Sequence, residues 1–352
     1  MRLALAAAAL LLVDAPVVVW DASPNYTASN REVTYDIDTI VIHTTEGSDT
    51  NGDGYYAECY TQAINWFNNP SASASAHYVV APWGAITQMV TDDDIAWHAT
   101  YYNNRSIGIE CAGFAGSPST WTPELLAALT QLVAWLCQQY GVPAVHPTDN
   151  ANDWGGWYGG TGVIAHAQVQ TSGSAAAAAY GVRTDPGPYF PWSTFMANVN
   201  AALAPSAPSN LQALAYLYDG AAAADFSWDA ATGADGYWLD IAQSPGDLES
   251  MSGTFQNLWV STNTIFTWTG LTPGATYSWR VYAYNGYGGA HAYPSGPVTM
   301  PTPAAPPADP PPATGGSRGG GGGGGCSAGP GSPAGVLLLT LLTLAALRAA
   351  RR

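Results

Sequence analysis

Several imidazole and carboxylate side chains in the first half of the chain are of types that bind metal ions. His43 ends the apolar run of "IVIHTTEG", and His166 ends a similar run in "GVIAHAQV". Asp185 follows His166 by 19 residues in "RTDPGPYFPW", where the Pro-Gly pair predicts a turn that can direct the carboxylate. A catalytic zinc ion keeps three such protein ligands and one water. Taken singly, each histidine is more often structural, so the three residues are candidates whose combination must be tested.

Short strands are expected to carry the reactive side chains. In "TIVIHTT", the alternation of residues places His43 on the face opposite Ile40 and Ile42, at the end of the strand where α/β sites form. In "SIGIECAG", Glu110 points away from the apolar face, which is made by Ile107, Ile109 and Cys111. Each strand therefore presents one apolar face and one chemically useful side chain.

Helical patterns separate these strands. The clearest one is "TPELLAALTQLVAWLCQQYG", where Thr122 can cap the helix, Pro123 fits its first position and Gly141 ends it. One face of this helix carries an apolar stripe of Leu125, Leu129, Leu132 and Leu136. A second helix is predicted over Tyr55–Asn68. Strands alternating with helices predict an α/β domain over residues 25–203.

The chain is strongly acidic. Its 352 residues contain no lysine, nine arginines and 25 Asp and Glu, which gives a formal net charge of −16. Such a charge repels phosphate backbones, so nucleic acid is excluded as a partner. Few charges and abundant Trp, Tyr, Gly and Ala are typical of a secreted protein that handles sugars or cell-wall polymers. We expect a monomer.

Both ends of the chain have features of an exported protein. Arg2 followed by the apolar run Leu3–Val13 is typical of a secretory signal, predicted over residues 1–22. A Pro- and Gly-rich linker is expected over residues 303–325. Residues 326–352 then join Cys326, a short apolar run and terminal arginines, which indicates a membrane anchor.

The same tail also resembles the myxo-type C-terminal sorting tails. The apolar run is shorter than the ~20 residues of a full membrane span. The resemblance implies that the tail is cleaved and that the protein is attached through Cys326. We therefore expect membrane contact only through the tail. The protein is expected at the cell surface or secreted, either attached to the outer membrane or released after the tail is processed.

Residues 206–302 carry short aromatic strands separated by turns, which predicts an all-β sandwich. The stretch "WTGLTPGATYSWRVYAYN" resembles the fibronectin type III family. In that resemblance Trp228 is the core tryptophan and Tyr277 the tyrosine of the tyrosine corner. Such modules space or position a neighbouring domain, so we assign this one no chemistry.

Two further patterns concern cysteines and calcium. Export makes one disulfide plausible among Cys59, Cys111 and Cys137, with the pairing open, and the absence of a CxxC motif or Cys/His cluster excludes a structural zinc knuckle. "DTNGDG" supplies the first half of a calcium loop through Asp49, Asn51 and Asp53. Tyr60 stands where that loop needs Glu, so a polar loop is preferred and a local Ca²⁺ site is the alternative.

The order of several segments in the first domain is more specific than any one of them. "IVIHTTEG", "SAHYVV", "AWHAT", "NNRSIGIECAG", "VIAHAQV" and "RTDPGPYFPW" follow one another with helices between them. Together they resemble the zinc-dependent N-acetylmuramoyl-L-alanine amidases of the amidase-2 family, which are related to peptidoglycan recognition proteins. The resemblance covers roughly residues 35–200. It implies a mixed central sheet with flanking helices and peptidoglycan as the partner.

The resemblance also implies a role for each candidate. His43, His166 and Asp185 become the ligands of one catalytic Zn²⁺. Glu110 matches the glutamate that acts as general acid and base, and Arg183 takes the place of a basic residue that stabilises the oxyanion. Position 76, before the histidine of "SAHYVV", is Ala rather than the Tyr of the phage-lysozyme branch, which favours the route through glutamate. The bond cleaved would join N-acetylmuramic acid to the L-alanine of the stem peptide.

Other residues of the quoted segments are expected near the site. Trp97, His98 and Asn104 are predicted to line the cleft, with core or turn positions as the alternative of nearly equal weight. His77 is expected to support a ligand rather than to bind metal. His146 and His291 are interpreted as loop residues.

Two alternative functions remain open from the sequence. The first is a non-catalytic surface protein of the same fold that binds peptidoglycan, although the retention of all three ligand candidates and Glu110 argues against it. The second is a surface zinc hydrolase that uses the same ligands on another amide. Comparing isolated stem peptides with glycan-linked ones as substrates would separate the second alternative from the amidase.

Overall fold

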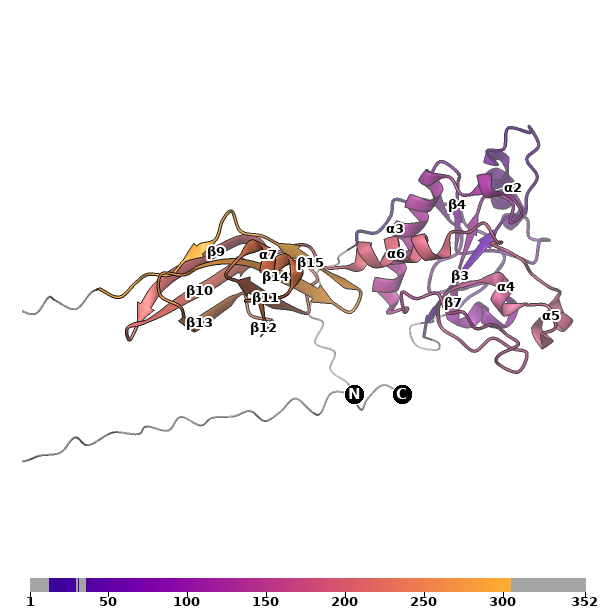
Figure 1. Cartoon of the computed structure of the whole chain (residues 1–352). Helices are drawn as coiled ribbons and strands as arrows, with labels where there is room; N and C mark the ends of the chain where they lie inside the picture. Colours follow the sequence, from indigo (N-terminus) through magenta and orange to yellow (C-terminus); the bar gives the residue numbers. More distant parts are fainter. Residues whose placement is uncertain (1–12, 30, 32–35, 305–352) are drawn as a thin grey trace, which may run out of the picture. The chain divides into compact units, whose positions relative to one another are not determined.

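The computed structural model describes residues 13–29, 31 and 36–304. Most of the predicted signal segment, most of the linker from residue 303 and the whole tail of residues 326–352 lie outside them. The described chain belongs to one compact unit, Met1–Ala304. Its secondary structure changes from mixed α and β to all-β between Leu203 and Ser209 (Figure 1). No helix in the described ranges has the length and apolar content needed to cross a membrane.

The α/β part is built on a six-stranded mixed sheet. Its strand order is β1-β5-β4-β7-β3-β8, in which only the β4–β5 pair is antiparallel. The strands are β1 (Val19–Trp20), β3 (Thr39–Thr44), β4 (Tyr78–Val80), β5 (Ile86–Gln88), β7 (Ser106–Cys111) and β8 (Gly162–Ala165). A separate pair joins β2 (Tyr26–Thr27) to β6 (Ile95–Ala96). The central strands β7, β3 and β8 are parallel, so their carboxyl ends lie at the same edge of the sheet.

Five α-helices and two 3₁₀ helices of the described chain accompany this sheet. They are α2 (Ala57–Phe67), α3 (Pro123–Tyr140), α4 (His166–Val169), α5 (Ala175–Tyr180), α6 (Trp192–Leu203), η1 (Thr100–Arg105) and η2 (Pro118–Thr120). The predicted ends of α3 are confirmed, because the Thr122 side chain accepts a hydrogen bond from the Leu125 amide and Gly141 adopts a φ of 69°. The second predicted helix is confirmed as the slightly shorter α2.

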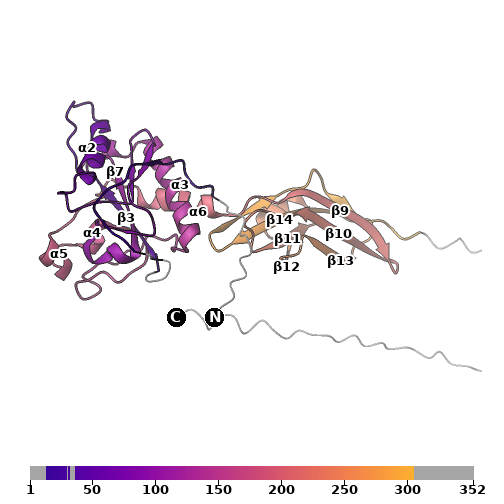
Figure 2. The ribbon, with the colours of Figure 1, turned by 180° about the vertical axis from the view of Figure 1, so that it is seen from behind.

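The two faces of the sheet bury different side chains. Ile40 and Ile42 of β3 join the main core with α3 and α6, which lie side by side in Figures 1 and 2. Val41 faces the opposite way into a smaller cluster with Tyr102 and Ile164. The predicted alternation is therefore confirmed, and His43 continues along the face of Val41. Full burial of one such aliphatic side chain contributes roughly 1.5–3 kcal/mol, so a shift of register that exposed this set would be strongly unfavourable.

The expected disulfide is wrong. Cys59, Cys111 and Cys137 are all free thiols, and all three are buried. Cys111 and Cys137 lie in the main core, where they pack as small apolar residues, and burial raises the pKa of Cys137 to about 12. No disulfide therefore links the cysteines of the described chain, although the composition is typical of an exported protein.

The all-β part is a sandwich of two sheets. One sheet contains β9 (Ser209–Tyr218), β10 (Ala221–Asp229) and β13 (Ile265–Leu271), and the other contains β11 (Gly236–Ala242), β12 (Gln256–Ser261), β14 (Thr276–Asn285), β15 (Gly288–Ala292) and β16 (Val298–Thr299). A short helix, α7 (Pro245–Ser250), follows β11. The fold class predicted from the sequence, an α/β domain with a mixed central sheet followed by an all-β sandwich, is confirmed.

The two residues predicted to mark the sandwich lie in its core. Trp228 is buried between the sheets with Tyr237, Leu239 and Val281. The hydroxyl of Tyr277 accepts a hydrogen bond from the Thr272 amide at 3.1 Å, which is the geometry of a tyrosine corner.

Candidate metal centre

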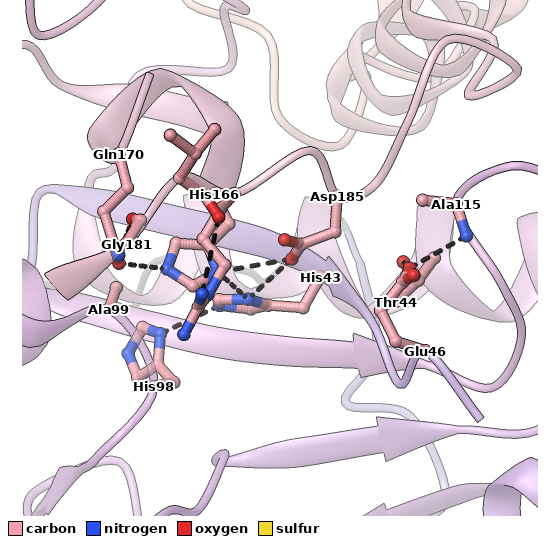
Figure 3. Close-up of polar contacts among 12 residues, drawn as sticks. His43, Thr44, Glu46, His98, Ala99, Ala115, His166, Gln170, Gly181 and Asp185 are labelled. Carbon is pink, nitrogen blue, oxygen red and sulfur yellow. Dashed lines mark hydrogen bonds and ion pairs between the residues drawn. The ribbon is translucent and has the colours of Figure 1, made fainter. Parts of the chain in front are cut away.

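Three side chains converge at the carboxyl end of the central strands. His43 Nδ1 lies 3.0 Å from His166 Nδ1 and 3.1 Å from Asp185 Oδ2, and His166 Nδ1 lies 3.3 Å from the same oxygen (Figure 3). We call these residues the metal triad. All three are buried, with 2%, 6% and 5% of their surface exposed. The sequence predicted this set, and the structure brings its three ligand atoms into one group that could hold a metal ion.

The sheet and one backbone hydrogen bond position the metal triad. Ile42 of β3 pairs with Ala165 of β8, so the next residues, His43 and His166, leave the two strands together. His166 is also the first residue of α4. The Ala167 amide donates a 3.0 Å hydrogen bond to the Asp185 carbonyl, which holds the third segment against the start of that helix. Two histidines are thus placed by strand register, and the segment of Asp185 is held by a backbone hydrogen bond.

Outer hydrogen bonds set the tautomer of His166. Its Nε2 lies 2.6 Å from Gln170 Oε1, while the amide nitrogen of Gln170 donates to the Tyr180 and Gly181 carbonyls (Figure 3). Because these two carbonyls fix the orientation of the Gln170 amide, its oxygen must accept a proton from His166 Nε2. The lone pair of His166 Nδ1 therefore points into the metal triad.

A longer chain of hydrogen bonds does the same for His43. Ser106 Oγ donates to the Tyr102 carbonyl at 2.7 Å and accepts from His98 Nε2 at 3.2 Å. That arrangement leaves His98 Nδ1 without a proton, so it accepts from His43 Nε2 at 3.0 Å. His43 Nδ1 is then also a bare acceptor. Gln170 and Ser106 were not predicted from the sequence, because neither stands in a position that local pattern connects to a ligand.

The electrostatics of the metal triad favour a bound cation. Burial, followed by the neighbouring His166, lowers the pKa of His43 to about 4, so its imidazole is neutral at pH 7. Burial raises the pKa of Asp185, whereas a proton held between Asp185 and either facing imidazole lowers that pKa below the ordinary range, so the carboxylate favours a positive charge in the metal triad. In the tautomers set by these outer hydrogen bonds, two imidazole nitrogens and one carboxylate oxygen face one another without a proton between them. Such a donor set fits a divalent metal ion, because the cation removes the repulsion among the three lone pairs.

Glu110 lies beside the metal triad, on β7. The ladder between β3 and β7 pairs it with His43. Its side chain lines the cleft, and its Oε2 atom is buried with no hydrogen-bond partner among the described residues. Burial, followed by the charges of Asp185 and Glu46, raises the pKa of Glu110 well above its usual value. A buried carboxylate with a raised pKa is suited to exchange protons.

The cleft over the metal triad contains most of the other predicted residues. Arg183, Trp97 and His98 line it. Asn104 does not, and this expectation is corrected: its side chain is exposed on η1, and the neighbouring Asn103 turns inward to accept hydrogen bonds from the His98 and Ala99 amides. The cleft also takes in residues of α2 and the segment before it that the sequence did not single out, namely Gly47, Gln62, Trp66 and Phe67.

His77 bonds to no residue of the metal triad, so the expectation that it supports a ligand is corrected: its ring lies 5.6 Å from that of His98, which is the residue that bonds to His43. The Nδ1 of His77 accepts a hydrogen bond from the Gly108 amide, and its Nε2 lies 2.9 Å from Nη2 of Arg31. Arg31 is fully buried and donates to the carbonyls of Asp92 and Ser106. No sequence signal marked this arginine, because an isolated Arg is normally a surface residue. Of the other two histidines, His146 stacks on Trp192 and His291 lies on strand β15 rather than in a loop.

The calcium alternative is not supported. Asp49 accepts hydrogen bonds from the Gly52 and Gly54 amides, and Asp53 accepts one from the Tyr55 amide. The carboxylates of the loop thus bind its own backbone amides, which favours the polar loop over the calcium site.

The α/β part of the chain is similar to known proteins. Residues 33–188 match the family model described as N-acetylmuramoyl-L-alanine amidase. The chain is 32% identical over 191 residues to N-acetylmuramoyl-L-alanine amidase A of Achromobacter lyticus, covering 53% of this chain and 96% of that protein.

Two solved structures match parts of the chain. The endolysin amidase LysCS of Clostridium intestinale URNW is 18% identical, with a TM-score of 0.34 over 53% of this chain and 98% of the other. The fn3 domain of the human collagen alpha-1(XX) chain is 23% identical, with a TM-score of 0.24 over 29% of this chain and 91% of the other.

The α/β fold and the buried His-His-Asp group define a hydrolase-like domain with a place for one metal ion. The chain belongs to the N-acetylmuramoyl-L-alanine amidase family. The enzyme class expected from the sequence is thereby confirmed.

Proposed function

We propose that this protein is an exported, zinc-dependent peptidoglycan hydrolase that cleaves the amide between N-acetylmuramic acid and the L-alanine of the stem peptide. One observation carries the proposal. Three bare acceptor atoms, on His43, His166 and Asp185, face one another beside the unpartnered carboxylate oxygen of Glu110. Imidazole and carboxylate ligands suit Zn²⁺, and a set of three leaves a position for substrate or water.

Glu110 acts as the proton carrier in this proposal. When bound, zinc polarises the scissile carbonyl and lowers the pKa of a bound water to ~7. Glu110, held on β7 next to His43, takes a proton from the attacking water and delivers it to the leaving amine of L-alanine. Its buried position supports both steps, because burial raises its pKa toward the pH at which it must accept and release a proton.

Arg183 and the cleft residues position the substrate. Arg183 lines the cleft two residues before Asp185, and its guanidinium offers a planar fork of N–H donors. Its guanidinium donates to the carbonyl oxygen as negative charge develops there. Trp97 and His98 form part of the wall of the same cleft, where they contact the sugar or the stem peptide.

The two ends of the chain are assigned to export and to attachment at the cell surface. The signal of residues 1–22 exports the protein, and the tail of residues 326–352 attaches it to the cell surface or is removed to release it.

The direct test uses the purified full-length protein on isolated peptidoglycan, with newly freed L-alanine amino groups and new reducing sugar ends measured together. We expect amino groups without reducing ends, loss of release after treatment with a chelator, and recovery on adding back zinc. Saturable binding to the wall with no release of amino groups would contradict the proposal and make this a binding protein of the same fold. Release that is undiminished after the metal has been removed would contradict the role of zinc.

A further inference from the structure

The outward face of one sandwich sheet carries a row of rings. In the ladders that join β12, β11, β14 and β15, Trp259 pairs with Trp238, Trp238 pairs with Tyr282, and Tyr282 pairs with His291. Tyr293 follows β15 on the same side, with its ring centroid 6.4 Å from that of His291. We call these five residues the aromatic face. The inner side chains of the same strands, among them Leu239 and Val281, form the sandwich core, so the aromatic face is not part of that core.

The aromatic face is accessible in the described chain. Trp259 and Tyr293 keep 60% and 53% of their surface exposed, and Trp238 and Tyr282 are half-buried. The cross-strand row of four rings spans three strand spacings of about 4.8 Å, or roughly 14 Å in all. Exposed apolar area of this kind on a small domain is characteristic of a binding surface.

A polar floor lies next to the rings. A hollow in this face is lined by Trp238, Tyr282 and His291 together with the buried Asp240 and Arg280. Arg280 Nε donates to Asp240 Oδ2 at 2.8 Å, and Asn257 donates to Asp240 Oδ1 at 2.6 Å. Arg280 Nη1 also donates to the Tyr293 hydroxyl at 3.1 Å, which ties the floor to the outermost ring. These contacts hold the side chains of Asp240, Asn257 and Arg280 in fixed positions beside the rings. Little side-chain conformational entropy is therefore lost when a ligand binds.

The chemistry of the hollow selects its ligand. Arg280 pairs with Asp240, and the exposed Glu249 lies 3.7 Å from the Nη1 of Arg280, so the floor offers hydrogen bonds without an excess of positive charge. Residues 206–302 contain seven carboxylates and one guanidinium, which disfavours anionic polymers. Flat rings in a row, with fixed hydrogen-bonding groups beside them, match the alternating C–H faces and hydroxyl or acetamido edges of linked pyranose rings.

We propose that the aromatic face binds an uncharged stretch of glycan chain, built from N-acetylated hexose units, through ring stacking and hydrogen bonds to the Asp240–Arg280–Asn257 floor. Such binding holds the enzyme on the sugar strands of the wall while the separate cleft of the α/β part acts on the stem peptide. The aromatic face shares no residue with the metal triad, so the inference does not depend on the catalytic proposal.

The test measures binding of the full-length protein to chitotetraose by calorimetry, and to insoluble chitin by sedimentation. Neither probe carries a charge or a stem peptide, so binding through stem-peptide recognition in the cleft is excluded. W259A and Y293A, at the two most exposed rings, are each expected to weaken binding about tenfold, and the double variant to lose it. Y218A is the matched control, because Tyr218 is 67% exposed on strand β9 of the other sheet. Circular dichroism checks that each variant is folded.

The outcomes separate the alternatives. Unchanged sugar binding in the double variant, or no sugar binding by the unaltered protein, would overturn the proposal. Binding of a synthetic peptide with the sequence of residues 301–314 in place of the sugar would assign the aromatic face to the Pro-rich linker and also overturn it. Turnover of a small soluble muropeptide is expected to be the same in the unaltered protein and in all four variants. A failure of catalysis would therefore show in that assay, independently of glycan binding.

Discussion

His43 and Glu110 lie directly across from each other on the adjacent parallel strands β3 and β7. One residue is a candidate metal ligand and the other the candidate proton carrier. The separation of their backbones is the spacing of neighbouring strands, about 4.8 Å, and does not depend on a loop. Both strands are buried in the middle of the sheet, so this part of the site is held by the core of the domain.

Replacement of Glu110 by Gln is expected to abolish most of the turnover while leaving the metal in place. An amide of the same size cannot carry a proton, and loss of a general base typically costs 10²–10⁴-fold in rate. Amine release from peptidoglycan and zinc content by mass spectrometry measure the two effects. E124Q is the matched control, because Glu124 is exposed at the start of α3. Wild-type turnover in E110Q would remove Glu110 from the mechanism.

Replacement of Gln170 by Leu is expected to weaken zinc binding by about 10–100-fold. The variant loses the acceptor that keeps the proton of His166 on Nε2, so the ring is free to place that proton on the metal-facing nitrogen. Competition with a fluorescent chelator measures the affinity. Q131L, on the exposed side of α3, should bind zinc like the unaltered protein. Equal affinity in Q170L and Q131L would show that this hydrogen bond does not tune the site.

The buried His77 is expected to make the domain sensitive to acid. Burial, followed by the charge of Arg31, lowers its pKa well below 6.5, and His98 behind the metal triad is lowered in the same way. Below pH 6.5 the unfolded chain binds a proton that the folded chain cannot. The stabilising effect of neutral His77 is therefore complete above pH 6.5 and is lost as the pH falls, at up to about 1.4 kcal/mol per pH unit.

The comparison of H77Q with the unaltered chain isolates this effect. Asp92 and Glu110, whose pKa values are raised, act in the opposite sense and are common to both chains. Urea unfolding with a chelator present, followed by the helical circular dichroism signal, gives the free energy of unfolding between pH 7.5 and 5. The slope should be shallower in H77Q than in the unaltered chain. Identical slopes would mean that His77 becomes protonated inside the folded domain.

The three buried cysteines are expected to react with thiol reagents only after unfolding. Burial raises the pKa of Cys111 and Cys137, which removes the thiolate, and all three side chains are inaccessible to reagent. Titration of the C326S variant in denaturant without a reductant should give three thiols, and none without denaturant. One thiol in denaturant would reveal a disulfide. The melting temperature should not change when a reductant is added.

The local sequence determined the elements that carry the site. Period-two alternation fixes which face of a strand each side chain occupies, so the positions of His43 and Glu110 followed from "TIVIHTT" and "SIGIECAG". Likewise Thr122 and Gly141 determined the ends of α3, because capping depends on residues within one turn. The order of six such segments was enough to identify the family.

Only the tertiary structure decided how these elements meet. The tautomers of His43 and His166 depend on Ser106 and Gln170, the cleft takes in Trp66 while Asn104 stays outside, and the thiols remain unpaired. The aromatic face likewise exists because three ladders align rings that are up to 53 residues apart in the chain, from Trp238 to His291. The physical reason is the same in each case. Backbone preference acts over a few residues, whereas register and side-chain hydrogen bonds are set by the packing of the whole domain.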